Sequence, residues 1–393
     1  MLAAASAAWT IGTEADALRW GAVIAGYGAM AVCGYVAVRV GGAEPLAALI
    51  VGLAVVAGLI GIFAAGFQEE PYSIRIGAAW RPAGPFEYPP ALGFLCVAAL
   101  PAAMRWAAAD SQRHLLGAFA VMVIGASVAL ISSRAVFALA AMVVIAALIR
   151  PRFALGGSRW MAIAVIAFAI TAGAAADAVA GSYDPPYEKS DDLLRIIGLA
   201  LLLPAGVGLW SAVRRCFDAR GRLRAIAGRR VLAFVGVPLI AALTAAALTP
   251  DTGPAGEPDS GFTHGRADIW SAAIDTAADG PFEGAGALTF LPATAQAGHP
   301  APDKLAHNLV LEAWVELGWP GLLASLALVL SAALLALRSR GTDAGWLLAP
   351  GAVAFLVAAM IDWPFHLPAS AAAFALILGG LGAAPGERGQ VKG

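Results

Sequence analysis

A histidine, an asparagine and two glutamates stand directly ahead of a long apolar run in "AHNLVLEAWVELGWPGLL", residues 306–323. An imidazole takes up a proton near neutral pH, and a positioned carboxylate or imidazole can move protons in a reaction, so these side chains suit general acid–base catalysis. Asn308, Glu312 and Glu316 recur every four residues and are predicted to share one face of a helix. His307 is the candidate base.

The residues before His307 indicate where this helix begins. Asp303 in "PAPDKL" is expected to cap it, because aspartate is a favoured N-cap residue. His307 would then lie in the first turns, where the helix dipole disfavours a charged imidazole, and we predict a neutral histidine that can act as a base. The alternative is an interfacial histidine without a catalytic role, followed by glutamates that form only a solvated helix face.

Four arginines stand in otherwise apolar surroundings, at positions 75, 81, 134 and 266. The guanidinium group is planar and always charged, and it matches the geometry of a phosphate group better than other cations do. If Arg75, Arg81, Arg134 and Arg266 share one pocket with His307, that pocket suits an anionic, phosphate-bearing ligand. For Arg134, which lies between two apolar runs, the alternative is a side chain that extends to the membrane interface.

The composition shows what kind of element must position these residues. The chain has 393 residues, of which 60% are hydrophobic and 13% charged, with a mean hydropathy of +0.78, so we expect an integral membrane protein. The apolar runs are continuous and lack the alternation of barrel strands, which predicts helices. About eleven spans are predicted, at residues 19–40, 45–66, 90–108, 115–131, 135–149, 160–180, 194–213, 231–249, 317–337, 345–360 and 369–384. The fold class is therefore an all-α, polytopic bundle, with residues 1–393 forming one membrane domain.

Arginine positions predict the orientation of this bundle. Residues 214–230 contain seven arginines and a single acid, so this loop is expected in the cytoplasm. Counting outward places the four arginines and His307 together on the opposite side. The external loops are then residues 67–89, 132–134, 181–193, 250–306 and 361–368, and the large loop 250–306 is expected to contain short helices. The N-terminus also falls outside, from which we expect that the beginning of the chain is incomplete.

Two further segments lie on the predicted external side. Asp362 and His366 in "IDWPFHLPA" either complete the pocket or cap helix ends, and capping is slightly favoured. Pro281, Gly284 and Gly286 in "DGPFEGAG" are interpreted as turn formers, because they lack the strand and the spacing of a nucleotide-binding loop.

The sequence gives no pattern for a metal or a cofactor. It contains five histidines, no acidic cluster with ligand spacing and no cysteine pair among Cys33, Cys96 and Cys216, so we expect no metal site. We also expect no cofactor and no nucleic-acid partner.

Several segments, taken in order, resemble the O-antigen ligase and O-antigen polymerase family of multi-pass bacterial glycosyltransferases. The resemblance runs from about residue 8 to residue 378. "RPAGPFEYPPALG" is similar to the family's Arg-x-x-Gly-x-Phe-x-Tyr-x-Asn segment, and "SSRAVFALA" to its Ser-Arg segment. "GRADIWSAAIDTAADGPFEGAGALTF" resembles its Gly-Arg, Trp and Gly-x-Gly-x-x-x-Phe stretch. "AHNLVLEAWVELGWPGLL" is similar to its His-Asn/Ser, Leu-Glu and Glu-x-Gly signature, and "DWPFHLPA" to its Asp-Phe-Pro loop.

The resemblance implies a GT-C-type fold in the bacterial inner membrane and a metal-independent, inverting transfer at the periplasmic face. The donor would be a glycan on undecaprenyl diphosphate, and the acceptor another glycan or the lipid A core. Arg81, Arg134 and Arg266 would hold the diphosphate and His307 would activate the acceptor hydroxyl. Arg75, Asn308, Glu312, Glu316 and Asp362 would support them.

The chain departs from the family pattern in two respects. Pro90 stands where the family has asparagine, which removes a polar contact at that position, and several N-terminal helices of the family are missing. The sequence does not choose between a ligase and a polymerase, because both use the same donor. A transporter or flippase of anionic lipid-linked saccharides is the alternative function. It would more often carry ionisable groups at mid-span, whereas the charges here collect at one face.

Overall fold

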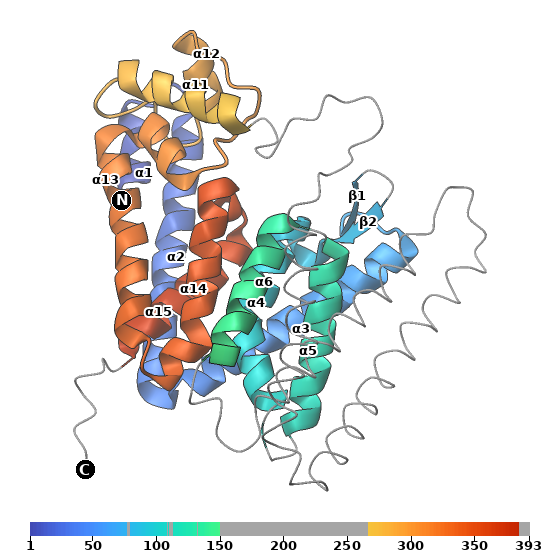
Figure 1. The fold of residues 1–393 in the computed structure, drawn as a ribbon. Coiled ribbons are helices and arrows are strands. Elements are labelled where there is room, and N and C mark those ends of the chain that lie inside the picture. Colours follow the sequence, from blue (N-terminus) through green and yellow to red (C-terminus); the bar gives the residue numbers. More distant parts are fainter. Residues whose placement is uncertain (77–78, 108, 110–112, 132, 150–265, 385–393) are drawn as a thin grey trace, which may run out of the picture. The chain divides into compact units, whose positions relative to one another are not determined.

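The computed structural model describes residues 1–76, 79–107, 109, 113–131, 133–149 and 266–384 (Figure 1). These residues are mostly helical. The helices are α1 (Leu2–Ala5), α2 (Glu14–Gly41), α3 (Ala43–Phe67), α4 (Pro89–Ala107), α5 (Arg113–Ile131), α6 (Arg134–Ile149), α11 (Arg266–Asp279), α12 (Phe290–Gln296), α13 (Leu309–Ser339), α14 (Asp343–Ile361) and α15 (Pro368–Ala383), with 3-10 turns η1 (Ser6–Ala8), η2 (Gly84–Phe86) and η5 (Pro364–His366). Two strands, β1 (Ser73–Ile76) and β2 (Ala79–Pro82), complete the described elements.

Six of the described helices are long and apolar enough to cross a membrane: α2, α3, α4, α5, α13 and α14. Helices α6 and α15 are apolar but shorter. This confirms a helical membrane protein. The predicted spans at residues 160–180, 194–213 and 231–249 lie outside the described residues, and the other predicted runs all fall on helices.

The chain divides into two compact units, residues 1–46 with 255–393 (unit 1) and residues 47–254 (unit 2). In unit 1, α2 packs along α15, and α14 packs against both α13 and α15. Helices α11 and α12 lie over the end of this bundle at which α2, α13 and α15 begin and α14 finishes (Figure 1). We call this end of unit 1 the capped end. The short helices expected in the loop 250–306 are therefore present in its described part, and residues 250–265 lie outside it.

Unit 2 is built around α4, whose residues are nearly all buried and which packs against both α5 and α6. Strands β1 and β2 form an antiparallel hairpin ahead of α4, in which Arg81 pairs with Ile74. This short hairpin, the sheet within the described residues, lies in a stretch predicted as an external loop, and the described fold is otherwise helical as predicted. Strand β2 also contacts α5, and α6 begins at Arg134, three residues beyond the last residue of α5. Arg81 and Arg134 thus belong to the same end of unit 2.

Helix α13 is interrupted at Gly318, whose φ of +62° and ψ of −153° are not helical. The segment after α11 enters this break through backbone hydrogen bonds. Trp319 N–H donates to the carbonyl of Phe282 at 3.0 Å, and Gly286 N–H donates to the carbonyl of Glu316 at 2.7 Å. The interruption frees backbone groups of the helix, and a neighbouring segment satisfies them through hydrogen bonds.

Gly284 generates a prediction about stability. Its φ is +79°, and a Cβ added there would lie 2.3 Å from the amide nitrogen of Gly318. We expect Gly284→Ala to destabilise the folded state by about 1–3 kcal/mol more than a change at an open position. The midpoint of thermal unfolding in detergent micelles measures this loss.

Gly298→Ala is the matched control, because Gly298 also has a positive φ of +82° but no atom within 4 Å of an added Cβ. Equal losses of thermal stability in the two variants would show that the contact at the helix break is unimportant.

Candidate functional site

His307 lies just before α13 in a left-handed backbone conformation, with φ of +50°. Such a conformation is uncommon outside glycine and indicates a position fixed by its surroundings. Asn308 is the N-cap of α13, and its side-chain oxygen accepts hydrogen bonds from the N–H groups of Val310 and Leu311 at 3.0 and 3.1 Å. The prediction that Asp303 caps the helix, with His307 in its first turns, was wrong, because Asn308 takes the extended conformation and makes these bonds instead.

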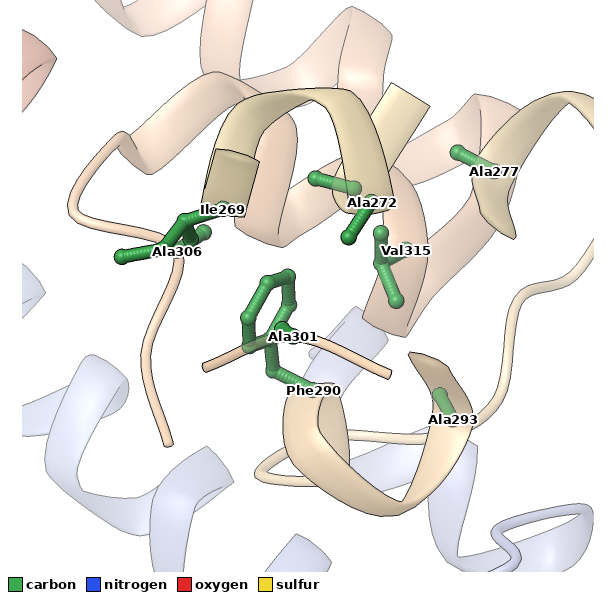
Figure 2. Close-up of a cluster of buried hydrophobic side chains, with 9 residues drawn as sticks. Ile269, Ala272, Ala277, Phe290, Ala293, Ala301, Ala306 and Val315 are labelled. Atoms are coloured by element: carbon green, nitrogen blue, oxygen red, sulfur yellow. The ribbon is translucent and has the colours of Figure 1, made fainter. Parts of the chain in front are cut away.

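The residue before His307 is held from both sides. Ala306 N–H donates to Oε2 of Glu312 at 3.1 Å, and the carbonyl of Ala306 accepts a hydrogen bond from the indole of Trp270 at 3.1 Å. Ala306 is fully buried in a cluster with Ile269 of α11 and Phe290 of α12 (Figure 2). Packing and hydrogen bonds together thus fix the chain that carries His307.

Two carboxylates flank the imidazole of His307. Its Nε2 lies 3.2 Å from Oδ2 of Asp303, and its Nδ1 lies 3.3 Å from Oδ1 of Asp362. The Asp362 side chain is 6% exposed and that of Asp303 is 43% exposed, while that of His307 is 15% exposed. The imidazole therefore has one buried carboxylate beside Nδ1 and one solvent-accessible carboxylate beside Nε2.

Burial alone would lower the pKa of His307, but the carboxylates of Asp362 and Asp303 outweigh burial and raise this pKa above its ordinary value. The expectation of a neutral imidazole set by the helix dipole is not supported, because α13 begins only at Leu309 and two carboxylates stand closer. His307 favours the protonated form more than a free histidine does. It becomes a base as the pH rises through this raised pKa.

A second imidazole–carboxylate pair lies beside the first. His366 in η5 contacts Oε1 of Glu312 through its Nε2, and its ring stacks on Trp20 of α2 with centroids 4.9 Å apart. Burial lowers the pKa of His366, but Glu312 outweighs burial and raises this pKa above its ordinary value. Because Glu312 also binds the Ala306 amide, one carboxylate connects His366 to the segment that carries His307.

Glu316 serves the backbone of the neighbouring segment. Its side chain is buried and accepts hydrogen bonds from the N–H groups of Leu288 and Phe290 at 2.9 and 3.1 Å. In the described part of the chain, the carboxylates of Glu312 and Glu316 thus pair with an imidazole and with backbone amides.

The arginines are divided between the two units. Arg266 begins α11 in unit 1, whereas Arg75 and Arg81 in the hairpin and Arg134 at the start of α6 belong to unit 2. Within the described ranges the Nε of Arg81 is buried without a hydrogen-bond partner, and a buried unpaired donor of this kind suits a bound acceptor. The meeting of these arginines with His307 in one pocket stays a prediction.

The sequence predicts a different role for two residues of the site and gives no sign of a third, Trp20. Asp303 is predicted to cap a helix, and capping is slightly favoured for His366. The position of His366, four residues after Asp362 in a loop on the predicted side of His307, is nevertheless a usable signal. Trp20 gave no signal, because an aromatic residue at the start of an apolar run looks like any interfacial or core side chain. Its stacking on His366 depends on the packing of α2 beside η5.

Asn308 joins the two helices that carry this cluster. Its side-chain amide donates to the carbonyl of Met360 at 3.0 Å, near the last residue of α14. Asp362 follows directly and its oxygen also accepts a hydrogen bond from the N–H of Trp363. The site is thus a set of two histidines and their carboxylates at the capped end of unit 1, able to accept and donate protons.

No protein-family model matches this chain, and no curated protein matches it significantly. Its function must therefore be argued from the site itself.

Proposed function

We propose that this protein is a membrane glycosyltransferase that moves a glycan from an undecaprenyl diphosphate carrier to an acceptor hydroxyl. The observation that supports it best is the environment of His307. The buried Asp362 carboxylate lies 3.3 Å from Nδ1, while Nε2 faces the exposed Asp303 carboxylate, which a substrate can displace. This is the arrangement that general-base histidines use in hydroxyl activation.

In this proposal the acceptor hydroxyl takes the place of the Asp303 carboxylate at Nε2 of His307. His307 removes the hydroxyl proton as the oxygen attacks the anomeric carbon of the donor. The bond from that carbon to the diphosphate oxygen breaks, and its electron pair leaves with the diphosphate. A single displacement of this kind inverts the anomeric configuration, and the Asp362 carboxylate stabilises the imidazolium that forms.

Arg81, Arg134 and Arg266 bind the leaving diphosphate in this proposal, and Arg75 supports them. Fixed cations aimed at a leaving group stabilise the charge that develops in the transition state. The unpaired, buried Nε of Arg81 supports an anion at that position. The site would face the periplasm, with the protein in the bacterial inner membrane.

The acceptor distinguishes the two enzyme types that share this donor. A ligase would use the lipid A core, and a polymerase would use another carrier-linked glycan. Incubation of purified protein with one labelled undecaprenyl diphosphate glycan and each acceptor in turn would identify the product. If no acceptor yields a larger glycan and no free carrier diphosphate appears, the glycosyltransferase proposal fails.

A transporter of anionic lipid-linked saccharides is the second candidate, and two observations favour it. Helix α13 is broken at Gly318, and the buried Glu312, Glu316 and partly buried His366 lie close to that break. Broken helices and intramembrane ionisable groups are common in carriers. The assay above separates the functions, because a carrier in detergent forms no glycosidic bond.

The first functional prediction concerns the base. We expect His307→Ala to lower turnover by about 10²- to 10⁴-fold, the usual contribution of a positioned base, while donor binding stays close to the parent value. Initial rates with saturating donor and a separate donor-binding titration check this. His299→Ala is the matched control, since His299 pairs with Asp279 at 3.4 Å on the exposed surface. A parent-like rate for His307→Ala would exclude His307 as the base.

The second functional prediction concerns pH. Because carboxylates raise the pKa of His307, activity should rise with pH through a midpoint above the ordinary histidine value of about 6.5. Asp362→Asn removes one of these charges, so the midpoint should move to lower pH while the plateau rate falls through loss of ring orientation. The pH profile of kcat/KM reports this shift. An unchanged midpoint in Asp362→Asn, with Asp279→Asn as control, would show that Asp362 does not act on the base.

The third functional prediction concerns the diphosphate. Arg266→Lys keeps the positive charge but loses the planar pair of donors. We expect kcat/KM to fall by about 10²- to 10³-fold, as when one donor to a developing anion is removed. Lys304→Arg serves as a control for an exchange of cations in the same unit. Similar rates for Arg266→Lys and the parent would remove Arg266 from the diphosphate site.

A further inference from the structure

We propose that Phe282, Leu288 and Trp319 form a surface that rests on the lipid bilayer at the boundary between head groups and acyl chains. We call these three residues the interfacial surface. It is separate from the glycosyl-transfer proposal and concerns how unit 1 is seated in the membrane. Its partner is the bilayer itself, identified by the apolar side chains that meet it.

The exposed side of α13 shows where the lipid begins. Large leucine side chains are 46–63% exposed at spacings of three and four residues, which forms one stripe along the helix. These are Leu323, Leu326, Leu330, Leu334 and Leu337. In the described residues of α13 before Gly318, no large apolar side chain is exposed to this degree, and exposure begins at Trp319 with 47%. The lipid-facing part of α13 therefore starts at the helix break.

The length of this stripe fits a membrane. From Trp319 to Leu337 an α-helix rises about 27 Å at 1.5 Å per residue, close to the hydrocarbon thickness of about 30 Å. Arg338 and Arg340 follow directly at the other end, and tryptophan is enriched at membrane–water interfaces. One boundary of the hydrocarbon core is thereby placed at Trp319.

The segment between α11 and α12 meets α13 at this level. The carbonyl of Phe282 accepts the Trp319 N–H at 3.0 Å, and the Phe282 side chain is 68% exposed. Leu288 is also exposed, and its backbone has a left-handed φ of +61°. This conformation is a clear outlier for leucine, and the Leu288 N–H is tied to Oε2 of Glu316 at 2.9 Å. The fold thus holds two exposed apolar side chains on the segment that is hydrogen-bonded to α13 at its break.

The neighbouring helix α11 is better suited to water. Its outer side exposes Asp268, Asp275 and Asp279 around a single large apolar side chain, Ile274, and carboxylates are repelled by anionic lipid head groups. The interfacial surface continues the lipid-facing stripe of α13 and lies next to the carboxylates of α11. This arrangement favours a bilayer over a second protein copy as the partner of the surface. It follows that His307 and Glu312, which precede the break, belong to the water side of the Trp319 level.

Depth-dependent quenching tests this surface. The native cysteines are replaced by alanine, and single cysteines are introduced by Phe282→Cys, Leu288→Cys or the control Asp275→Cys. Each is labelled with an environment-sensitive fluorophore and reconstituted in phosphatidylcholine vesicles with bromine at shallow acyl positions. We expect the labels at 282 and 288 to be quenched several-fold more strongly than the label at 275. Iodide in the buffer should quench in the opposite order.

Equal lipid quenching at 282, 288 and 275 would overturn the proposal. Labels at 282 and 288 that are shielded from both bromine and iodide would also overturn it, in favour of a protein partner. Size-exclusion profiles confirm that each variant is folded. The measurement needs neither donor nor turnover, so its failure is distinguishable from failure of the proposed transferase activity.

Discussion

The buried carboxylate of Glu312 is the interaction on which the described site depends. A carboxylate at this depth is unfavourable unless its oxygens are bound, and here one oxygen binds the Ala306 amide while the other contacts His366. The first contact holds the segment that carries His307, and the second holds η5 against α13. One side chain thereby connects the segment just before α13 to η5, in which His366 lies 54 residues after Glu312.

The break in α13 separates two environments within one helix. Before Gly318 the helix presents polar side chains to neighbouring segments, whereas after Gly318 the leucine stripe is exposed. Glu316 stabilises this transition, because its carboxylate binds the amides of Leu288 and Phe290 and so holds the α12 segment beside the break. The glycines at 284 and 318 allow the two backbones to approach closely enough for these bonds.

Much of the fold follows from the sequence, because hydropathy determines where a chain can cross a membrane. Helices α2, α13 and α14 correspond to predicted apolar runs, and the motif around His307 was found from its residue types alone. The cap of α13 and the charge state of His307 could not be found in this way. Asp303 and Asn308 are both good capping residues, and only the tertiary contacts of Ala306 and Asp362 decide between them. The hairpin was missed because short interfacial strands carry little periodic signal.

The relation between the two histidines argues for chemistry near the membrane surface rather than for a path across the membrane. Both imidazoles are paired with carboxylates, and both belong to the capped end of unit 1, before α13 reaches its lipid-facing stripe. A proton path through unit 1 would require further ionisable groups along the helices, yet in the described residues of α13 after Gly318 no ionisable side chain occurs before Arg338. Proton exchange at His307 can instead take place directly with water beside the exposed Asp303. In the proposed transferase, a base at this position exchanges protons with solvent, whereas a proton-coupled carrier needs continuity across the bilayer.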